Sequence, residues 1–148
     1  IKIMKRISYF ALAALLAFNM LFTTAYASSA PVVERIDYQD GSYALISVER
    51  TVSRSTTSDS KTYAYFSPSG EKCFSYILSA TFTYDGRTSK ADTCYADVFF
   101  YVRGWTCTSH SEYVSGNTAY GSAAFSGPGG VTRNVNLTMT CDANGNVK

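Results

Sequence analysis

The sequence has little that could hold a metal ion. Its one histidine is His110, and its four cysteines, Cys73, Cys94, Cys107 and Cys141, are never closer than 13 residues. Zinc sites use closely spaced ligand pairs such as C-x-x-C, so this spacing argues against zinc. We therefore predict neither a metal nor another cofactor.

Clusters of basic side chains are also missing once residues 1–27 are set apart. That segment holds three of the 13 Lys and Arg and none of the 11 Asp and Glu, which leaves ten positive and eleven negative side chains in the rest. A net charge of about −1 with no basic cluster gives no electrostatic footprint for nucleic acid or an anionic membrane. We expect neither as a partner of the mature form.

Residues 1–27 have the pattern of an export signal. Three basic residues precede an apolar run over 10–22, and the A-x-A pattern of a cleavage site follows at 25–27. The run is shorter than the roughly 20 residues of a membrane span and is interrupted by Asn19. We predict a signal helix that is cleaved after Ala27 and a secreted, extracellular product.

Helical periodicity is lacking in the rest of the chain, where the dominant period is two. Within 72–84, Phe74, Tyr76 and Leu78 share one parity while Ser75 and Ser79 share the other. This alternation is typical of a strand with one buried face. Asp-Gly at 85–86 then predicts a hairpin return into a strand over 93–103.

The remaining chain divides into short strands and turns. Further strands are predicted over 43–52, 62–66, 113–114, 118–126 and 131–141, with turn signals at 67–70, 115–117 and 127–130. Gly-Trp at 104–105 is interpreted as a bulge, residues 28–41 as a flexible leader, and the Ser/Thr-rich segment 53–61 as a loop tip. These elements predict one all-β domain over 42–148, an antiparallel β-sandwich of an immunoglobulin-like or jelly-roll variant.

Several segments also resemble, in fixed order, a group of small secreted proteins of Gram-positive gut bacteria. They are "ATFTYDGRTSKADTC" (80–94), "GW" (104–105), "SGNTAYGSAAF" (115–125) and "VNLTMTCDANGNV" (135–147). The likeness covers about residues 72–148, and no activity is assigned to the group, so it implies no catalytic or binding residue.

The four cysteines predict two disulfides in an exported protein, and the sequence alone leaves three connectivities open. In the resembling group the cysteines that match Cys94 and Cys141 recur together. The resemblance thus implies a bond between Cys94 and Cys141, which leaves Cys73 with Cys107.

Two polar segments are candidates for chemistry. Asp142, Asn144 and Asn146 have the alternation of calcium ligands, but Gly145 stands fourth rather than sixth in such a loop, so we predict a turn. His110 would need a nucleophile and an acid beside it, and we predict that its neighbours are near in sequence only. No spacing singles out a pair of carboxylates for glycoside hydrolysis. We therefore predict that the protein is not an enzyme.

Aromatic residues are the one excess, with ten Tyr, six Phe and one Trp after residue 27. For the core we predict Phe74, Phe82, Phe100 and Phe125. For a possible binding surface we predict Tyr95, Phe99 and Tyr101, which have the opposite parity to Cys94 and Val98, together with Tyr63, Tyr65 and Trp105. The alternative is that a second sheet or the leader covers this face.

The function predicted from these features is that of a secreted, non-catalytic binding module for an extracellular glycan or protein surface. One alternative is a bacteriocin or toxin-like protein, which would inhibit bacterial growth. Another is a small hydrolase, which would need a pocket that joins His110 to distant serines or carboxylates.

Overall fold

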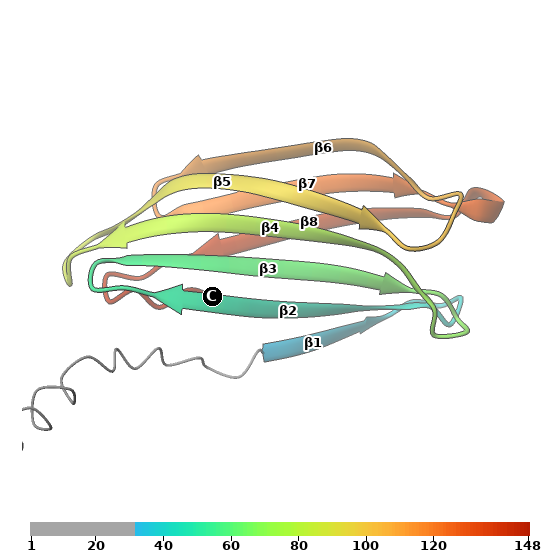
Figure 1. Cartoon of the computed structure of the whole chain (residues 1–148), viewed down its shortest axis with the longest axis horizontal. Coiled ribbons are helices and arrows are strands. Elements are labelled where there is room, and N and C mark those ends of the chain that lie inside the picture. Colours follow the sequence, from blue (N-terminus) through green and yellow to red (C-terminus); the bar gives the residue numbers. More distant parts are fainter. Residues whose placement is uncertain (1–31) are drawn as a thin grey trace, which may run out of the picture.

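The computed structural model describes residues 32–148, so the predicted signal helix and cleavage site lie outside the described residues. Within these residues eight strands form two antiparallel sheets, which confirms the predicted β-sandwich (Figure 1). One sheet contains β1 (Val32–Asp37), β2 (Tyr43–Val52), β3 (Thr56–Phe66), β4 (Lys72–Tyr84) and β5 (Ser89–Phe100); the other contains β6 (Thr106–Ser115), β7 (Thr118–Ser126) and β8 (Thr132–Thr140). Within 32–148 no helix is long and apolar enough to cross a membrane.

The order of the strands is strictly sequential in both sheets, β1-β2-β3-β4-β5 and β6-β7-β8. Immunoglobulin-like and jelly-roll sandwiches need Greek-key connections, in which strands distant in sequence become neighbours. Neither predicted variant is therefore correct, and each sheet is an up-and-down meander. The chain changes sheets once in the described range, between β5 and β6. Gly104 has a φ of 91° there and belongs to this connection, not to the predicted bulge.

The core lies between the two sheets and is built from the inward parity of each strand. Phe74 of β4 stacks on Phe125 of β7 with ring centroids 4.1 Å apart, and Phe82 is also fully buried. Three of the four predicted core phenylalanines are thus confirmed. Phe100 is 45% exposed, contrary to prediction, because it ends an edge strand and meets Phe125 only edge-on at 6.2 Å.

Three polar segments predicted to lack structure are in fact strands. The expected flexible leader contributes β1, which pairs with β2 in register from Val32 to Asp37. The expected loop tip contributes the first half of β3, where Thr57 and Asp59 are buried and hydrogen-bonded to each other at 2.7 Å. Similarly, β6 extends seven residues before the predicted 113–114. In these strands polar side chains occupy some of the positions that face the core, so the sequence does not show an alternation of apolar and polar residues.

The predicted disulfides are not formed, and all four cysteines are free thiols. Cys94 does face inward, but its neighbour across the sheet is Ala80, whose other neighbour is Asp59 of β3. Burial, followed by the charges of Asp142 and Asp59, raises the pKa of the Cys141 thiol, which donates to the carbonyl of Asp142 at 3.3 Å. Cys94 lies on β5 of one sheet, whereas Cys141 directly follows β8 of the other, and no bond joins them.

The second predicted pair, Cys73 and Cys107, is also separate. The Cys73 thiol donates to the carbonyl of Glu71 at 3.4 Å, and the Cys107 thiol donates to the carbonyl of Ser109 at 3.3 Å. Burial raises the pKa of both thiols. The stability of the domain therefore depends on packing and hydrogen bonds between the sheets.

Candidate functional site

The outer face of β5, with the residue that follows its end, carries three of the six residues that the sequence predicted for a binding surface. Tyr95, Phe99 and Tyr101 are 60%, 50% and 53% exposed, and we call them the β5 aromatic strip. Phe99 and Tyr101 are two residues apart, about 7 Å along the strand, and Tyr95 lies about 13 Å from Phe99. Within residues 32–148 neither the second sheet nor β1 covers this face, because all three side chains are exposed.

Tyr101 is held in place by residues of β4. Its hydroxyl hydrogen-bonds to the Ser75 hydroxyl at 3.3 Å and accepts from the Lys72 ammonium at 3.2 Å. The same ammonium lies over the Tyr101 ring, 4.4 Å from its centroid. The hydrogen bond from Ser75, followed by that from Lys72, lowers the pKa of the Tyr101 phenol. Lys72 and Ser75 were missed in the sequence because only the register between β4 and β5 brings them beside the strip.

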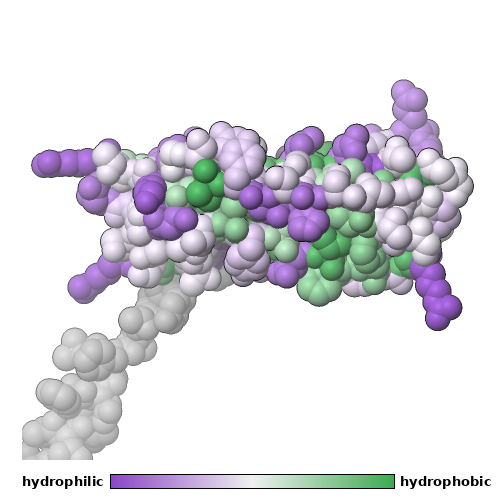
Figure 2. Space-filling model, turned by 90° about the horizontal axis from the view of Figure 1, so that it is seen from above, coloured by the Kyte–Doolittle hydropathy of each residue, from purple (hydrophilic) through white to green (hydrophobic). Residues whose placement is uncertain are grey.

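Polar groups alternate with the rings of the strip. Asp97 points outward between Tyr95 and Phe99, and Ser79 is the partner of Tyr95 across the sheet. Seen from the side of β5 and β6, the surface shows hydrophobic atoms gathered in places among hydrophilic ones (Figure 2). A surface of this kind offers apolar ring faces and hydrogen-bonding groups to the same ligand.

Three other predicted surface residues are buried, and that prediction is wrong. Tyr63 and Tyr65 are 3% exposed and Trp105 is 9% exposed. In β3, Tyr63 and Tyr65 are the cross-strand partners of Tyr76 and Phe74, so they share the core face of β4. Trp105 packs on Tyr65 and Phe74 with centroid distances of 5.1 and 4.9 Å. Burial raises the pKa of Tyr63, whose hydroxyl is paired with Tyr38 at 2.7 Å.

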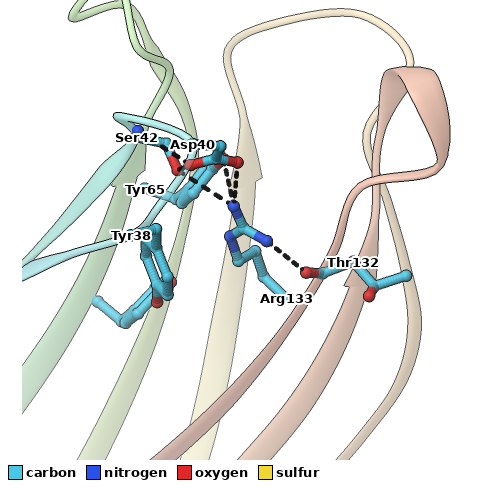
Figure 3. A network of polar contacts seen from close by, with 7 residues as sticks. Tyr38, Asp40, Ser42, Tyr65, Thr132 and Arg133 are labelled. Carbon is cyan, nitrogen blue, oxygen red and sulfur yellow. Dashed lines mark hydrogen bonds and ion pairs between the residues drawn. The ribbon is translucent and has the colours of Figure 1, made fainter.

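Arg133 of β8 joins the two sheets near one end of the sandwich. Its guanidinium donates to Asp40 at 2.6 Å, to the Tyr65 hydroxyl at 3.3 Å and to the carbonyl of Thr132 at 2.8 Å (Figure 3). It also lies 4.4 Å from the centroid of the Tyr38 ring. Burial lowers the pKa of Arg133, but Tyr65 and Asp40 together raise it above its ordinary value. We interpret this cluster as a structural clamp because Asp40 already neutralises the cation.

His110 is oriented by an acid, which the sequence analysis did not expect. Its Nδ1 lies 3.1 Å from both carboxylate oxygens of Glu112, and the Tyr76 hydroxyl donates to the same carboxylate at 2.7 Å. Burial, followed by the hydrogen bond to Glu112, raises the pKa of Tyr76. Within residues 32–148 no hydroxyl or thiol hydrogen-bonds to His110, so the geometry of a nucleophile, base and acid is not assembled.

The segment 142–146 forms the predicted turn. The Asp142 carboxylate accepts from the backbone N–H of Asn144 at 2.8 Å and of Asn146 at 2.9 Å, and Gly145 has a φ of 83°. The Asn146 side-chain amide also donates to this carboxylate at 2.9 Å, and this bond, followed by the backbone ones, lowers the pKa of Asp142. In the described range no group of three His, Cys, Asp or Glu side chains has the arrangement of a metal site.

The fold and the strip together define a class of protein: a two-sheet, up-and-down β-sandwich with exposed aromatic side chains on one edge strand. Comparison of the chain with protein-family models, curated proteins and solved structures gave no match. The resemblance to secreted proteins of Gram-positive bacteria therefore stays a prediction.

Proposed function

We propose that the protein is a secreted, non-catalytic binding protein that engages a glycan through the β5 aromatic strip. The observation that carries the proposal is the exposure of three large aromatic side chains on one strand face. Monomeric proteins seldom leave such groups together in water without a partner. Secretion rests on the export signal in residues 1–27.

The polar neighbours of the strip favour a sugar over a protein as the ligand. A protein interface of ordinary size buries about 800 Å² on each partner, and charged groups are depleted at its centre. Asp97 stands in the middle of the strip, where such an interface would desolvate its carboxylate. An extended glycan can place the C–H faces of its rings on Phe99 and Tyr101 while its hydroxyls donate to Asp97.

The proposal is tested by measuring binding of the mature protein to an array of glycans and then comparing variants on the strongest ligand. We expect Tyr95→Ala, Phe99→Ala and Tyr101→Ala each to weaken binding about tenfold, which corresponds to 1.4 kcal/mol. Val33→Ala is the matched control, because Val33 is also exposed on the outer face of this sheet. Its affinity should equal that of the wild type.

Two outcomes would reject the glycan. If none of the three aromatic variants changes binding, the strip is not the site. If no glycan binds and a purified cell-surface protein does, the partner is a protein. Release of shorter oligosaccharides from the bound glycan would show hydrolysis and contradict a non-catalytic role, and growth inhibition of bacteria by the pure protein would favour the toxin alternative.

A further inference from the structure

The outer face of the three-stranded sheet contains a shallow hollow on the side of the molecule opposite the β5 aromatic strip. Small polar residues line it: Ser109 and Ser111 from β6, Ser122 from β7, and Asn134 and Asn136 from β8. The register explains their grouping, because Ser111 pairs with Ser122 and Ser122 pairs with Asn136. One row across the sheet therefore presents two hydroxyls and an amide.

Two tyrosines lie beside the hollow on the same face of the sheet, beyond the residues that line it. On β6, Tyr113 comes two residues after Ser111, and on β7, Tyr120 comes two residues before Ser122. Both tyrosines therefore lie on the same face as the serines, about 7 Å further along the strands. Their rings stack with centroids 4.8 Å apart and an interplanar angle of 11°. Tyr113 is nevertheless 56% exposed, which leaves ring surface open to a ligand.

The polar groups in the hollow are free to bind. On the other sheet, neighbouring hydroxyls satisfy one another, as Ser60 and Ser79 do at 2.9 Å. Ser122, Asn134 and Asn136 are exposed, and within residues 32–148 their side chains are not engaged by another side chain. Each can both donate and accept, which matches the hydroxyl groups of a sugar.

The charge of the lining selects among hydroxylated ligands. His110 is the one ionisable side chain among the lining residues, and its Nδ1 already lies 3.1 Å from the Glu112 carboxylate, so the hollow offers no lysine or arginine to pair with a phosphate, a sulfate or a uronic acid. A neutral sugar needs no such partner, and a second sugar ring could stack on the exposed Tyr113 beside the hollow.

We propose that this hollow is a second binding site, specific for a neutral sugar unit, and that one chain can therefore hold two glycan segments on opposite faces. Binding at the hollow does not depend on the β5 aromatic strip, because the hollow has its own polar groups, whereas the linking of two glycan segments rests on the proposed function of the strip. If both sites act, a single chain links two polysaccharide strands and gains avidity on a surface that displays many.

The test is an NMR titration of the ¹⁵N-labelled mature protein with neutral oligosaccharides of β-linked glucose, β-linked N-acetylglucosamine, β-linked xylose and α-linked glucose. Concentrations up to about 10 mM would detect dissociation constants in the millimolar range. We expect at least one of them to shift the amide resonances of Ser122, Asn134 and Asn136. Asn136→Ala and Tyr113→Ala should each raise the dissociation constant obtained from these shifts about tenfold.

Ser122→Phe provides a variant that fills the hollow without removing its hydrogen-bonding neighbours. It should abolish the shifts, whereas Thr132→Ala, on the same face of β8 but outside the hollow, should leave them unchanged. Circular dichroism of every variant checks that the sheets are intact. Absence of shifts at Ser122, Asn134 and Asn136 with all four oligosaccharides would overturn the proposal, as would shifts that persist in Ser122→Phe.

The two sites are separated by a second readout, the turbidity of a mixture with a soluble neutral polysaccharide that binds the wild type. Crosslinking requires both faces, so Phe99→Ala and Ser122→Phe should each abolish turbidity while retaining one set of NMR shifts. If Phe99→Ala leaves the hollow shifts intact but no ligand ever shifts Tyr95 or Phe99, the strip proposal fails and the hollow stands. If Phe99→Ala removes the hollow shifts, the hollow is not an independent site.

Discussion

Single carboxylates fix several turns of this protein, and Asp142 is the clearest example. Its oxygens accept from two backbone N–H groups and from the Asn146 side chain at 2.9 Å, all of which stabilise the ionised form. Asp85 does the same in the hairpin between β4 and β5, where it accepts from Arg87 and Thr88. In both turns the fold lowers the pKa of the carboxyl below its ordinary value.

This lowering predicts the pH dependence of stability. A carboxyl whose pKa is lower when folded than when unfolded stabilises fully above its unfolded pKa of about 3.9, and that contribution is lost as the pH falls through the folded pKa. In Asp142→Asn we expect the unfolding free energy to fall less than in the wild type as the pH is lowered from about 5 to 2. The reason is that an amide oxygen still accepts a hydrogen bond but does not titrate. Urea unfolding at a series of pH values measures it.

The control for this experiment is Asn144→Ala, which keeps both the Asp142 carboxylate and the backbone donor at 144. Its pH dependence should match that of the wild type. If the unfolding free energy of Asp142→Asn fell with pH as steeply as that of the wild type, the turn would not stabilise the ionised form of Asp142.

The sequence located some individual aromatic residues correctly and others not, and the difference is physical. Tyr95 and Phe99 alternate with inward residues such as Val98 over a long strand, so their parity is unambiguous. Tyr63 and Tyr65 lie in "TYAYF", where both parities carry apolar side chains and only pairing with β4 decides which is inside. Tyrosine hydroxyls find partners in the core, as Tyr63 does with Tyr38, so amphipathic character did not predict exposure.

At the scale of elements, strands with regular apolar alternation were predicted well. The bounds 72–84, 43–52 and 118–126 coincide with β4, β2 and β7. The missed strands β1 and β6 and the first half of β3 are polar because they lie at sheet edges or bury paired polar groups such as Thr57 with Asp59. Propensity and period carry little information in such strands, since neighbours supply the stability.

Close packing of β7 against β4 makes a second prediction. Gly121 lies beneath the Tyr76 side chain, where an added Cβ would be 2.6 Å from the Tyr76 hydroxyl and 2.9 Å from Leu78 Cδ1. We expect Gly121→Ala to destabilise the fold by about 1–3 kcal/mol, because the sheets must separate or Tyr76 must leave Glu112. Chemical denaturation measures the loss.

The matched control on β7 is Ser126→Ala, whose side chain points to the outer face. A change within about 0.5 kcal/mol is expected there. The idea that β4 and β7 are in tight contact would be contradicted if Gly121→Ala were as stable as this control.

At the scale of the whole molecule, the last residues tie the two sheets together at one end of the sandwich. Val147 forms a bridge with Cys141, and its carbonyl accepts from Arg50 of β2 at 2.7 Å. The same guanidinium donates to the buried carboxylate of Asp59 at 3.1 Å. The sequence did not predict this link because Arg50 and Val147 are 97 residues apart.

This junction leads to the last prediction. Arg50→Met leaves the Asp59 carboxylate buried with only Thr57 as its donor, and removing one member of a buried pair costs about 3–5 kcal/mol. Because Arg50 is 22% exposed, water can reach the gap, and we expect a loss nearer about 2–3 kcal/mol in urea unfolding. The double variant Arg50→Met with Asp59→Leu removes the stranded charge and should recover most of the loss. If the double variant is less stable than Arg50→Met alone, Asp59 stabilises this end of the sandwich independently of Arg50, and its bond to Thr57 is the contact that holds it.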